Sequence, residues 1–140
     1  MAALAVTANS CIVTGTYTAI VIQAGETVTA GMVLYKKSSD SKWYKAQADG
    51  TAEESGSGVQ MCIALGNCVA SQFIGGLTSG TVTSGATHTK GYTVYLHTTA
   101  GSFTETEADV ASTNYKTYIG VANSTAIMNV NFNATGIALT

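Results

Sequence analysis

The chain of 140 residues contains no proline and no arginine, and only 10% of its residues are charged. Without proline, no position is barred from a central β-strand on that account. Without arginine, the chain lacks the side chain that binds phosphate in a bidentate way and stacks on bases. The net charge of −2 also argues against the basic face that nucleic-acid binding requires. We therefore expect no nucleic-acid partner.

The sequence has no long apolar run, and we expect no secretory leader. No apolar run approaches the roughly 20 residues of a membrane span, so we expect no membrane partner. The opening MAALAVTANS has no basic residue before its apolar stretch, unlike a secretory signal. The sequence therefore predicts a protein that folds in the cytoplasm in which it is made.

Cysteine is scarce and odd in number, at Cys11, Cys62 and Cys68. An odd count without a leader argues against a disulfide framework. The segment MCIALGNCVAS predicts a hairpin with Gly66–Asn67 in a two-residue turn. That turn would place Cys62 opposite Ser71 and put the two nearby thiols on opposite faces. We interpret them as small buried apolar residues.

Threonine, alanine, glycine and serine fill the place of the missing charge, while 46% of the residues are hydrophobic. Threonine is β-branched and favours strands, so the composition predicts a β-protein with a hydroxyl-rich surface. Such a surface is often covered by further copies or by a larger partner. The alternative is a monomer kept soluble by its hydroxyl groups. The length suits a single domain.

One segment occurs twice, sixty positions apart: GETVTAGMVLY (25–35) resembles GATHTKGYTVY (85–95). In the same alignment Trp43 corresponds to Phe103, and the match ends where Ala48–Asp49 corresponds to Ala108–Asp109. After a slip of four positions, MCIALGN (61–67) aligns with TYIGVAN (117–123). We interpret residues 17–73 and 77–132 as two degenerate copies of one unit.

Each copy has the same predicted order of elements. A tight corner lies between two glycines, where glycine supplies a positive φ, and a short strand, a polar turn and a second strand follow. A fully buried strand closes the unit. The corner glycines are Gly25, Gly31, Gly85 and Gly91. The predicted fold is all-β, a small barrel or sandwich built from two degenerate copies of one β-unit.

The two ends of the chain differ from the units. We expect residues 1–16 to be an N-terminal arm or edge segment and residues 17–140 to be a single β-domain. The front is apolar but lacks strand alternation, so we expect a frayed terminus or an edge strand on one interpretation, and an arm that lies on a neighbouring molecule on the other. If it is an arm, removing residues 1–12 would leave the fold intact. The candidate contacts in this segment are Ala2, Ala3, Leu4 and Val6.

The inventory of reactive side chains is small, and we expect neither an enzyme, a cofactor nor a metal site. His88 and His97 show no second ligand or carboxylate partner at a suitable spacing. Alternation along an extended segment would place Glu105, Glu107 and Asp109 on one face. We interpret these carboxylates as a solvated edge rather than a calcium site.

Four of the six lysines lie in YKKSSDSKWYK (35–45), together with two tyrosines and the single tryptophan. One interpretation is a solvated hairpin whose Trp43 fills the core. The other is a basic, aromatic tip that docks on an acidic neighbour, because aromatic residues are enriched at interfaces. The candidate contacts are Tyr35, Lys36, Lys37, Lys42 and Tyr44.

Three stretches resemble the capsid decoration (cement) proteins of tailed bacteriophages: AGMVLYKKSSDSKWYKAQAD, GVQMCIALGNCVASQF and GATHTKGYTVYLHTTAGSFTETEADVASTNYKTYIGVANSTA. The shared features are the glycine corner, an apolar strand ending near tyrosine, a Ser/Thr-rich turn, an Ala-Asp pair and an Ile-Gly-Val-Ala-like strand, in this order. The resemblance covers residues 23–132. Lys36–Lys37 and the cysteines depart from the family pattern, so the resemblance does not indicate which surface of the protein docks on the capsid.

The resemblance implies a structural role. Such proteins bind the outer surface of the expanded head, where they contact the major capsid protein and assemble as homotrimers. They stabilise the shell against the pressure of packaged DNA, so the protein would be located on the virion after synthesis in the host bacterial cytoplasm. The alternative is a phage tail or fibre module that binds a receptor, because Thr-rich β-modules also serve there.

Overall fold

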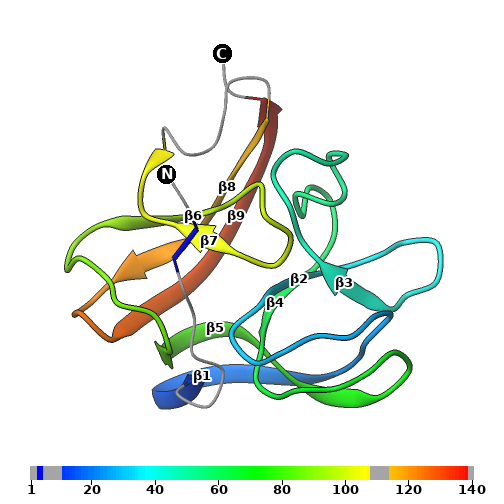
Figure 1. Ribbon diagram of the computed structural model, residues 1–140, viewed down its shortest axis with the longest axis horizontal. Helices are drawn as coiled ribbons and strands as arrows, with labels where there is room; N and C mark the ends of the chain where they lie inside the picture. The colour runs from blue at the N-terminus through cyan, green and yellow to red at the C-terminus, as the bar shows by residue number, and fades with distance from the viewer. Residues whose placement is uncertain (1–2, 5–10, 108–113, 139–140) are drawn as a thin grey trace.

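Strands joined by turns and loops make up the computed structural model, which describes residues 3–4, 11–107 and 114–138 (Figure 1). These residues form an all-β fold without an α-helix, as predicted. None of them forms a helix long and apolar enough to span a membrane. The strands are β1 (Cys11–Gln23), β2 (Val33–Lys36), β3 (Trp43–Lys45), β4 (Met61–Ala64), β5 (Phe73–Ser84), β6 (Thr93–Leu96), β7 (Phe103–Thr104), β8 (Tyr115–Ala122) and β9 (Ile127–Ala138).

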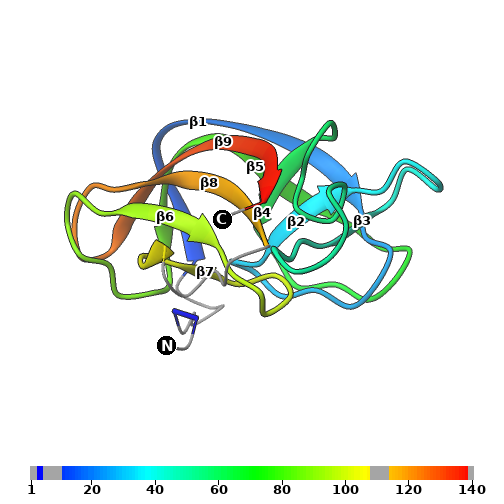
Figure 2. The same ribbon diagram turned by 90° about the horizontal axis from the view of Figure 1, so that it is seen from above.

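The strands form one antiparallel sheet in the order β3-β2-β4-β5-β9-β8-β6-β7. The sheet curls into a half-barrel, which is clearest from above (Figure 2). Strand β5 lies at the centre of this sheet. Strand β1 pairs along one edge of β5, whereas β4 and then β9 pair along the other edge. The curled sheet therefore divides at β5 into two similar halves.

The two halves have the same pairing pattern. In the first, β2 pairs with β3 and β4, β4 pairs with β5, and β5 pairs with β1. In the second, β6 pairs with β7 and β8, β8 pairs with β9, and β9 pairs with β5. Strand β5 is thus the last strand of one unit and the first strand of the next. The sequence repeat corresponds to a structural repeat that shares one strand.

Equivalent hydrogen bonds fix the alignment of the copies. The Gly31 N–H donates to the Ala64 carbonyl, and the Gly91 N–H donates to the Ala122 carbonyl, both at 2.8 Å. Ala122 therefore occupies the place of Ala64, a slip of two positions rather than the four expected from the sequence. The offset predicted from the sequence was wrong because MCIALGN and TYIGVAN were matched by residue type. In the structure the pairing of β4 with β2 and of β8 with β6 sets the register.

The corner glycines serve two different needs. Gly31, Gly85 and Gly91 have φ angles of 89°, 84° and 87°, the left-handed conformation that was expected. Gly25 does not have this conformation, which corrects the prediction for that position. It lies against the Tyr44 ring, and a Cβ at Gly25 would come within 2.2 Å of the ring carbon Cζ. Close approach, not φ, requires glycine there.

The buried residues form two clusters, and the larger one joins the halves. It combines Val33, Ile63 and Leu77 from the first half with Val94, Phe103 and other residues from the second. Neither half contains this core alone, which is consistent with a single β-domain. The smaller cluster lies within the first half and contains Ile22, Ala24, Val28, Leu34, Trp43, Cys62, Ala64 and Cys68.

The predicted two-residue hairpin at Gly66–Asn67 is wrong. Strand β4 pairs instead with Gly76 and Leu77 in the first half of β5, while Cys68 forms an isolated bridge with Val28. Cys62 and Cys68 consequently share the smaller cluster, and they do not lie on opposite faces of a hairpin. Both are buried free thiols, as predicted, and burial raises the pKa of each.

The start of the chain is built into the same molecule. The Leu4 N–H donates to the Phe103 carbonyl at 3.0 Å, and the Leu4 side chain packs against the larger cluster. From Cys11 onward the expected arm is an edge strand, β1, paired with β5. Removing residues 1–12 would break these contacts, so we no longer expect such a truncation to leave the fold unperturbed. Ala3 is half-buried, and Ala2 and Val6 lie outside the described residues.

Candidate functional site

The lysine-rich segment forms the hairpin of β2 and β3. Tyr35 pairs with Tyr44 and Lys36 with Trp43 across the two strands. The tip is closed by two hydrogen bonds: the Lys37 N–H donates to the Lys42 carbonyl, and the Ser41 N–H donates to the Lys37 carbonyl, both at 2.9 Å. The hairpin therefore presents a fixed tip.

Two aromatic residues of this hairpin point inward. Trp43 is 3% exposed and belongs to the smaller cluster, as the solvated-hairpin interpretation expected. Tyr35 is 6% exposed and belongs to the larger cluster, so it is a core residue rather than a surface contact. Burial, reinforced by the nearby carboxylates of Glu54 and Glu53, raises the pKa of Tyr35 to about 12. Tyr35 lies on the same face of β2 as Val33, which belongs to the same cluster, because side chains two positions apart in a strand point to one face.

Carboxylates neutralise part of the basic character expected for the tip. Lys45 forms a long ion pair with Glu26, with Nζ and Oε1 separated by 3.8 Å. Glu53 accepts hydrogen bonds from the backbone N–H and the hydroxyl of Ser38, at 2.9 Å and 2.7 Å. These bonds tie the tip to the loop before β4 and lower the pKa of Glu53. The hairpin is thus a mixed-charge surface.

Asp40 and Tyr44 form the polar contact at the end of the tip. The Tyr44 hydroxyl donates to Asp40 Oδ2 at 2.6 Å, and the Lys42 N–H donates to Oδ1 at 2.9 Å. The hydrogen bond from Tyr44, followed by that from Lys42, holds the pKa of Asp40 below its ordinary value of 3.8. The same contact raises the pKa of Tyr44. Above the Tyr44 ring lies Lys37, with Nζ 5.0 Å from the ring centroid.

We expect Tyr44→Phe to raise the pKa of Asp40 toward its ordinary value, because the variant removes the leading cause of the depression. The native contact stabilises the fold above the unfolded-state pKa of Asp40, and its contribution is lost as the pH falls through the lower folded-state pKa. NMR titration of the Asp40 carboxyl carbon measures the change. The matched control is Tyr92→Phe at an exposed tyrosine outside the hairpin. The control should leave the Asp40 pKa unchanged, and an Asp40 pKa that is also unchanged in Tyr44→Phe would contradict the assignment.

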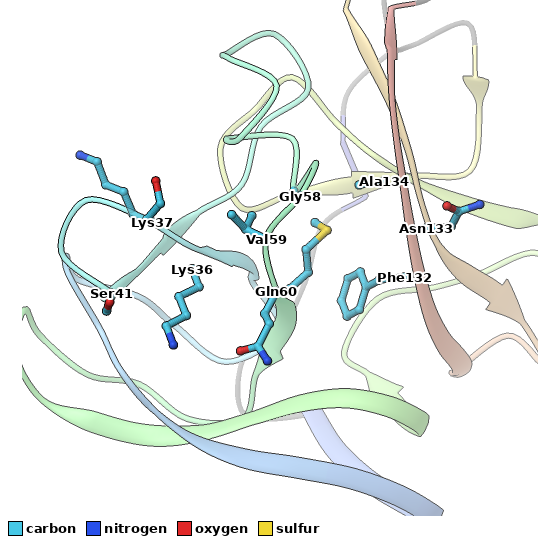
Figure 3. Close-up of a pocket in the computed structure, with 12 residues that line it drawn as sticks. Lys36, Lys37, Ser41, Gly58, Val59, Gln60, Phe132, Asn133 and Ala134 are labelled. Atoms are coloured by element: carbon cyan, nitrogen blue, oxygen red, sulfur yellow. The ribbon is translucent and has the colours of Figure 1, made fainter.

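A pocket of about 540 Å³ opens beside the hairpin, between the loop before β4 and strand β9 (Figure 3). Lys36, Lys37 and Ser41 lie on the hairpin side. Phe132 points from β9 toward Val59 and contributes an aromatic surface to the opposite side. Cationic side chains on one wall and an aromatic ring on the other could accept a carboxylate-bearing segment of a partner protein. The sequence drew attention to the lysines but gave no sign that Phe132 lies opposite them.

A second pocket of about 550 Å³ lies on the other side of the hairpin. Its lining includes Glu26, Glu53 and Glu54 alongside Lys37 and Lys45. Because carboxylates outnumber lysines there, this side suits an acidic partner less well than the first pocket. Lys37 lines both pockets and therefore marks the ridge between them.

The structure gives His88 the carboxylate partner that the sequence did not reveal. His88 Nε2 lies 2.5 Å from the Ser84 hydroxyl, and Nδ1 lies 3.1 Å from Glu105 Oε2. Glu105 also accepts the Thr89 N–H, at 2.9 Å to Oε2 and 3.0 Å to Oε1. The His88 ring stacks on Phe103 at 5.9 Å between ring centroids. The expectation that His88 lacks a partner is therefore wrong.

Serine, histidine and carboxylate are linked by hydrogen bonds in the same order as in a hydrolase triad, but a substrate has no access to the serine hydroxyl. Ser84 is fully buried and His88 nearly so, and a nucleophile needs an open path to its substrate. The Ser84 hydroxyl is also within 3.3 Å of the Ala86 N–H, which donates to it. We interpret the group as a polar cross-link that holds the second glycine corner against β7.

The equivalent positions in the first copy hold Ala24, Val28 and Lys45, at the sixty-residue spacing. Ala24 and Val28 belong to the apolar smaller cluster. Three polar residues thus replace two apolar residues and a lysine together. This joint change between the copies is the sequence signal that could have identified the cross-link.

The remaining candidate groups have local partners. His97 Nδ1 accepts the Thr99 N–H at 2.9 Å, within the turn after β6. Glu107 forms an ion pair with Lys116 at 2.9 Å, whereas Glu105 is buried with His88, so these two carboxylates do not share a solvated edge. Asp109 lies outside the described residues. Within the described part of the chain, no three His, Cys, Asp or Glu side chains come together as a potential metal site.

Comparisons with known proteins add no identification. The chain matches no family model, no curated protein and no solved structure.

Proposed function

We propose that the chain is a structural protein of a tailed bacteriophage that binds the outer surface of the capsid and stabilises the head against internal DNA pressure. The observation that carries the proposal is the repeated β-unit: its glycine corner, strand, Ser/Thr-rich turn and aromatic strand occur in the order that characterises capsid decoration proteins. The shared strand β5 and the joint core connect the two units through one continuous sheet. A continuous sheet and core suit a protein that reinforces a shell.

The surface chemistry supports the same proposal. Few charges and many hydroxyl groups suit a protein that is covered by a large partner rather than one that binds nucleic acid. The cross-link at His88 is buried, so it supports a structural role better than a catalytic one. The proposed partner is the major capsid protein, and the copies would assemble as a homotrimer on the shell, where symmetry multiplies a modest contact area.

The pocket beside Lys36 and Lys37 is the proposed contact with the capsid. It combines two partly exposed cationic side chains with the Phe132 ring, and a carboxylate-rich loop of a capsid subunit would complement it. Unlike Lys45, which pairs with Glu26, Lys36 and Lys37 line this open pocket. The tip that holds them is prearranged by its hydrogen bonds, which limits the entropy lost on binding.

The test is cosedimentation of the full chain with undecorated, expanded heads of its source phage, scored as copies bound per head. We expect saturation at a fixed number related to the three-fold positions of the shell. A Lys36→Ser, Lys37→Ser double variant should bind roughly 10-fold more weakly, because it removes two charges from the contact. The matched control is Lys90→Ser, which removes an exposed lysine elsewhere on the surface.

Absence of saturable binding to heads would overturn the proposal and favour the tail or the receptor as the place of action. Binding that is equally weakened by Lys36→Ser, Lys37→Ser and by Lys90→Ser would retain the capsid role but contradict the pocket as the contact, because a general charge effect would then explain the loss.

A further inference from the structure

A pocket of about 330 Å³ lies on the solvent face of β6, β8 and β9. Along β9 the buried Met128 and Val130 alternate with the exposed Asn129 and Asn131, so the asparagines point away from the core. The described residues that line the pocket carry no charge and are Thr93, Tyr118, Gly120, Val121, Asn129, Asn131 and Asn133. The pocket is therefore polar but neutral.

The backbone of β8 creates the space in this pocket. Its pairing with β6 and its pairing with β9 both shift register between Tyr118 and Gly120, as at a β-bulge. The shift brings Tyr118 and Val121, three positions apart, onto one face of the sheet. Gly120 lies between them, and a Cβ there would clash with the carbonyl oxygen of Asn129. Only glycine fits at this position, so no side chain fills the space.

The amide groups of the three asparagines are free to bind a ligand. Within the described part of the chain, their side chains form no hydrogen bond. Other amide side chains serve the fold: Asn67 accepts the Ala30 N–H, and Gln47 donates to Glu54. An asparagine amide has an acceptor oxygen and two donor hydrogens. The pocket thus presents donors and acceptors side by side, and no internal bond has to break before a ligand uses them.

The internal repeat excludes an apolar occupant for this surface. In the first copy, one row of paired residues across β2, β4 and β5 consists of Val33, Ile63 and Leu77. The equivalent row across β6, β8 and β9 consists of Thr93, Val121 and Asn129. The first row is buried in the larger cluster, whereas the second is open to solvent. Its polar residues disfavour the packing of a further β-unit, as at the end of a repeat array.

We propose that this pocket binds an uncharged saccharide, with hydroxyl groups paired to the asparagine amides and C–H groups packed against Tyr118. A sugar hydroxyl both donates and accepts, which matches the adjacent amide groups. The Tyr118 ring supplies the aromatic surface on which the apolar parts of a ligand can pack. The volume lies at the lower end of the range of small-molecule sites, roughly 300–1,000 Å³, so it suits a short saccharide rather than a long chain.

The charges next to the pocket favour a neutral ligand. The Lys116 ammonium lies over the Tyr118 ring, 5.1 Å from its centroid. Lys116 also forms an ion pair with Glu107 at 2.9 Å, so the two charges compensate each other at the border of the pocket. Burying a charged ligand without a counter-charge is costly, which selects against anionic and cationic ligands.

The inference goes beyond the proposed function and can be tested separately from it. Asn133 lines both this pocket and the one beside Lys36, whereas Asn129 and Asn131 line this pocket and not the other. Replacing Asn129 and Asn131 should therefore leave binding to phage heads unchanged. Saccharide binding and head binding can succeed or fail independently.

The test is an NMR titration of the full chain with four neutral trisaccharides: maltotriose, cellotriose, mannotriose and chitotriose. We expect at least one of them, at up to about 10 mM, to shift the side-chain amide signals of Asn129, Asn131 and Asn133 to saturation. An Asn129→Ala, Asn131→Ala double variant should bind roughly 10-fold more weakly, because it removes two hydrogen-bonding groups. The matched control is Asn123→Ala, at an exposed asparagine that does not line the pocket, and it should bind as the wild type does.

Absence of saturable shifts at the three asparagines with all four trisaccharides would overturn the inference, and the polar face would then serve only to prevent packing of a further unit. Saturable shifts centred on residues outside the pocket would overturn it as well. So would a double variant that binds as tightly as the wild type. The amide shifts of the wild type need no variant, so they decide the question even if the double variant failed to fold.

Discussion

Replacing Phe103 by alanine is expected to lower the free energy of unfolding by about 3–5 kcal/mol, near the upper end for a single core substitution. Phe103 is fully buried and is among the largest fully buried side chains of the fold. It belongs to the cluster that joins the halves, stacks on His88, and accepts the Leu4 N–H at its carbonyl. Alanine would leave a cavity at the junction of the two units. Equilibrium unfolding in urea measures the loss.

The control for this prediction is Tyr92→Ala, which removes an aromatic ring that is 54% exposed. We expect a change within about 0.5 kcal/mol for that variant. Trp43→Ala at the equivalent place in the first copy should also be strongly destabilising, because Trp43 fills the smaller cluster. A loss below about 1 kcal/mol for Phe103→Ala would contradict its central place in the core.

The sequence predicted the elements that depend on local chemistry. Strands β2 and β6, and the starts of β3 and β7, lie sixty positions apart in the structure, as the repeated corner, turn and aromatic position predicted. Each of these features is encoded within a few residues: glycine at a left-handed corner, hydroxyl residues at a turn and an aromatic residue on an inward face. The all-β class followed from the same signals.

The elements that depend on distant partners were not predictable in this way. The Gly66–Asn67 turn had the local signal of a hairpin, but β4 pairs with Gly76 and Leu77 of β5, and Cys68 in the intervening loop bridges to Val28. Long-range pairing replaced the local preference. The shared use of β5 also could not be seen, because a boundary placed at residues 73 and 77 divides a strand that serves both units.

At the candidate site, the sequence identified the lysine tip but not its partners. It placed Tyr35 among surface contacts, although this residue packs in the larger cluster that joins the two halves. It also missed Phe132, which β9 brings to the pocket from the far end of the chain. Contacts between residues so far apart carry no spacing signal in a single sequence.

The second large prediction concerns Glu105 in the buried cross-link. Glu105→Ala is expected to lower the free energy of unfolding by roughly 2–4 kcal/mol, because it leaves His88 Nδ1 buried without its partner and removes the acceptor of the Thr89 N–H. The Glu105→Gln variant is the matched control. It retains an acceptor oxygen and nearly the same volume, so it should lose less. Urea unfolding of the three proteins gives the comparison.

The internal repeat sharpens this test, because the first copy supports an apolar version of the same corner with Ala24 and Val28. Combining Ser84→Ala and His88→Val with Glu105→Ala removes every member of the polar group at once. Replacing the three polar side chains together is less destabilising than removing one, since no buried side-chain donor or acceptor of the group is left unpaired and only the N–H groups of Ala86 and Thr89 lose an acceptor. We therefore expect the triple variant to be more stable than Glu105→Ala alone. Losses that simply add across the three positions would show that Ser84, His88 and Glu105 act separately and do not form one cross-link.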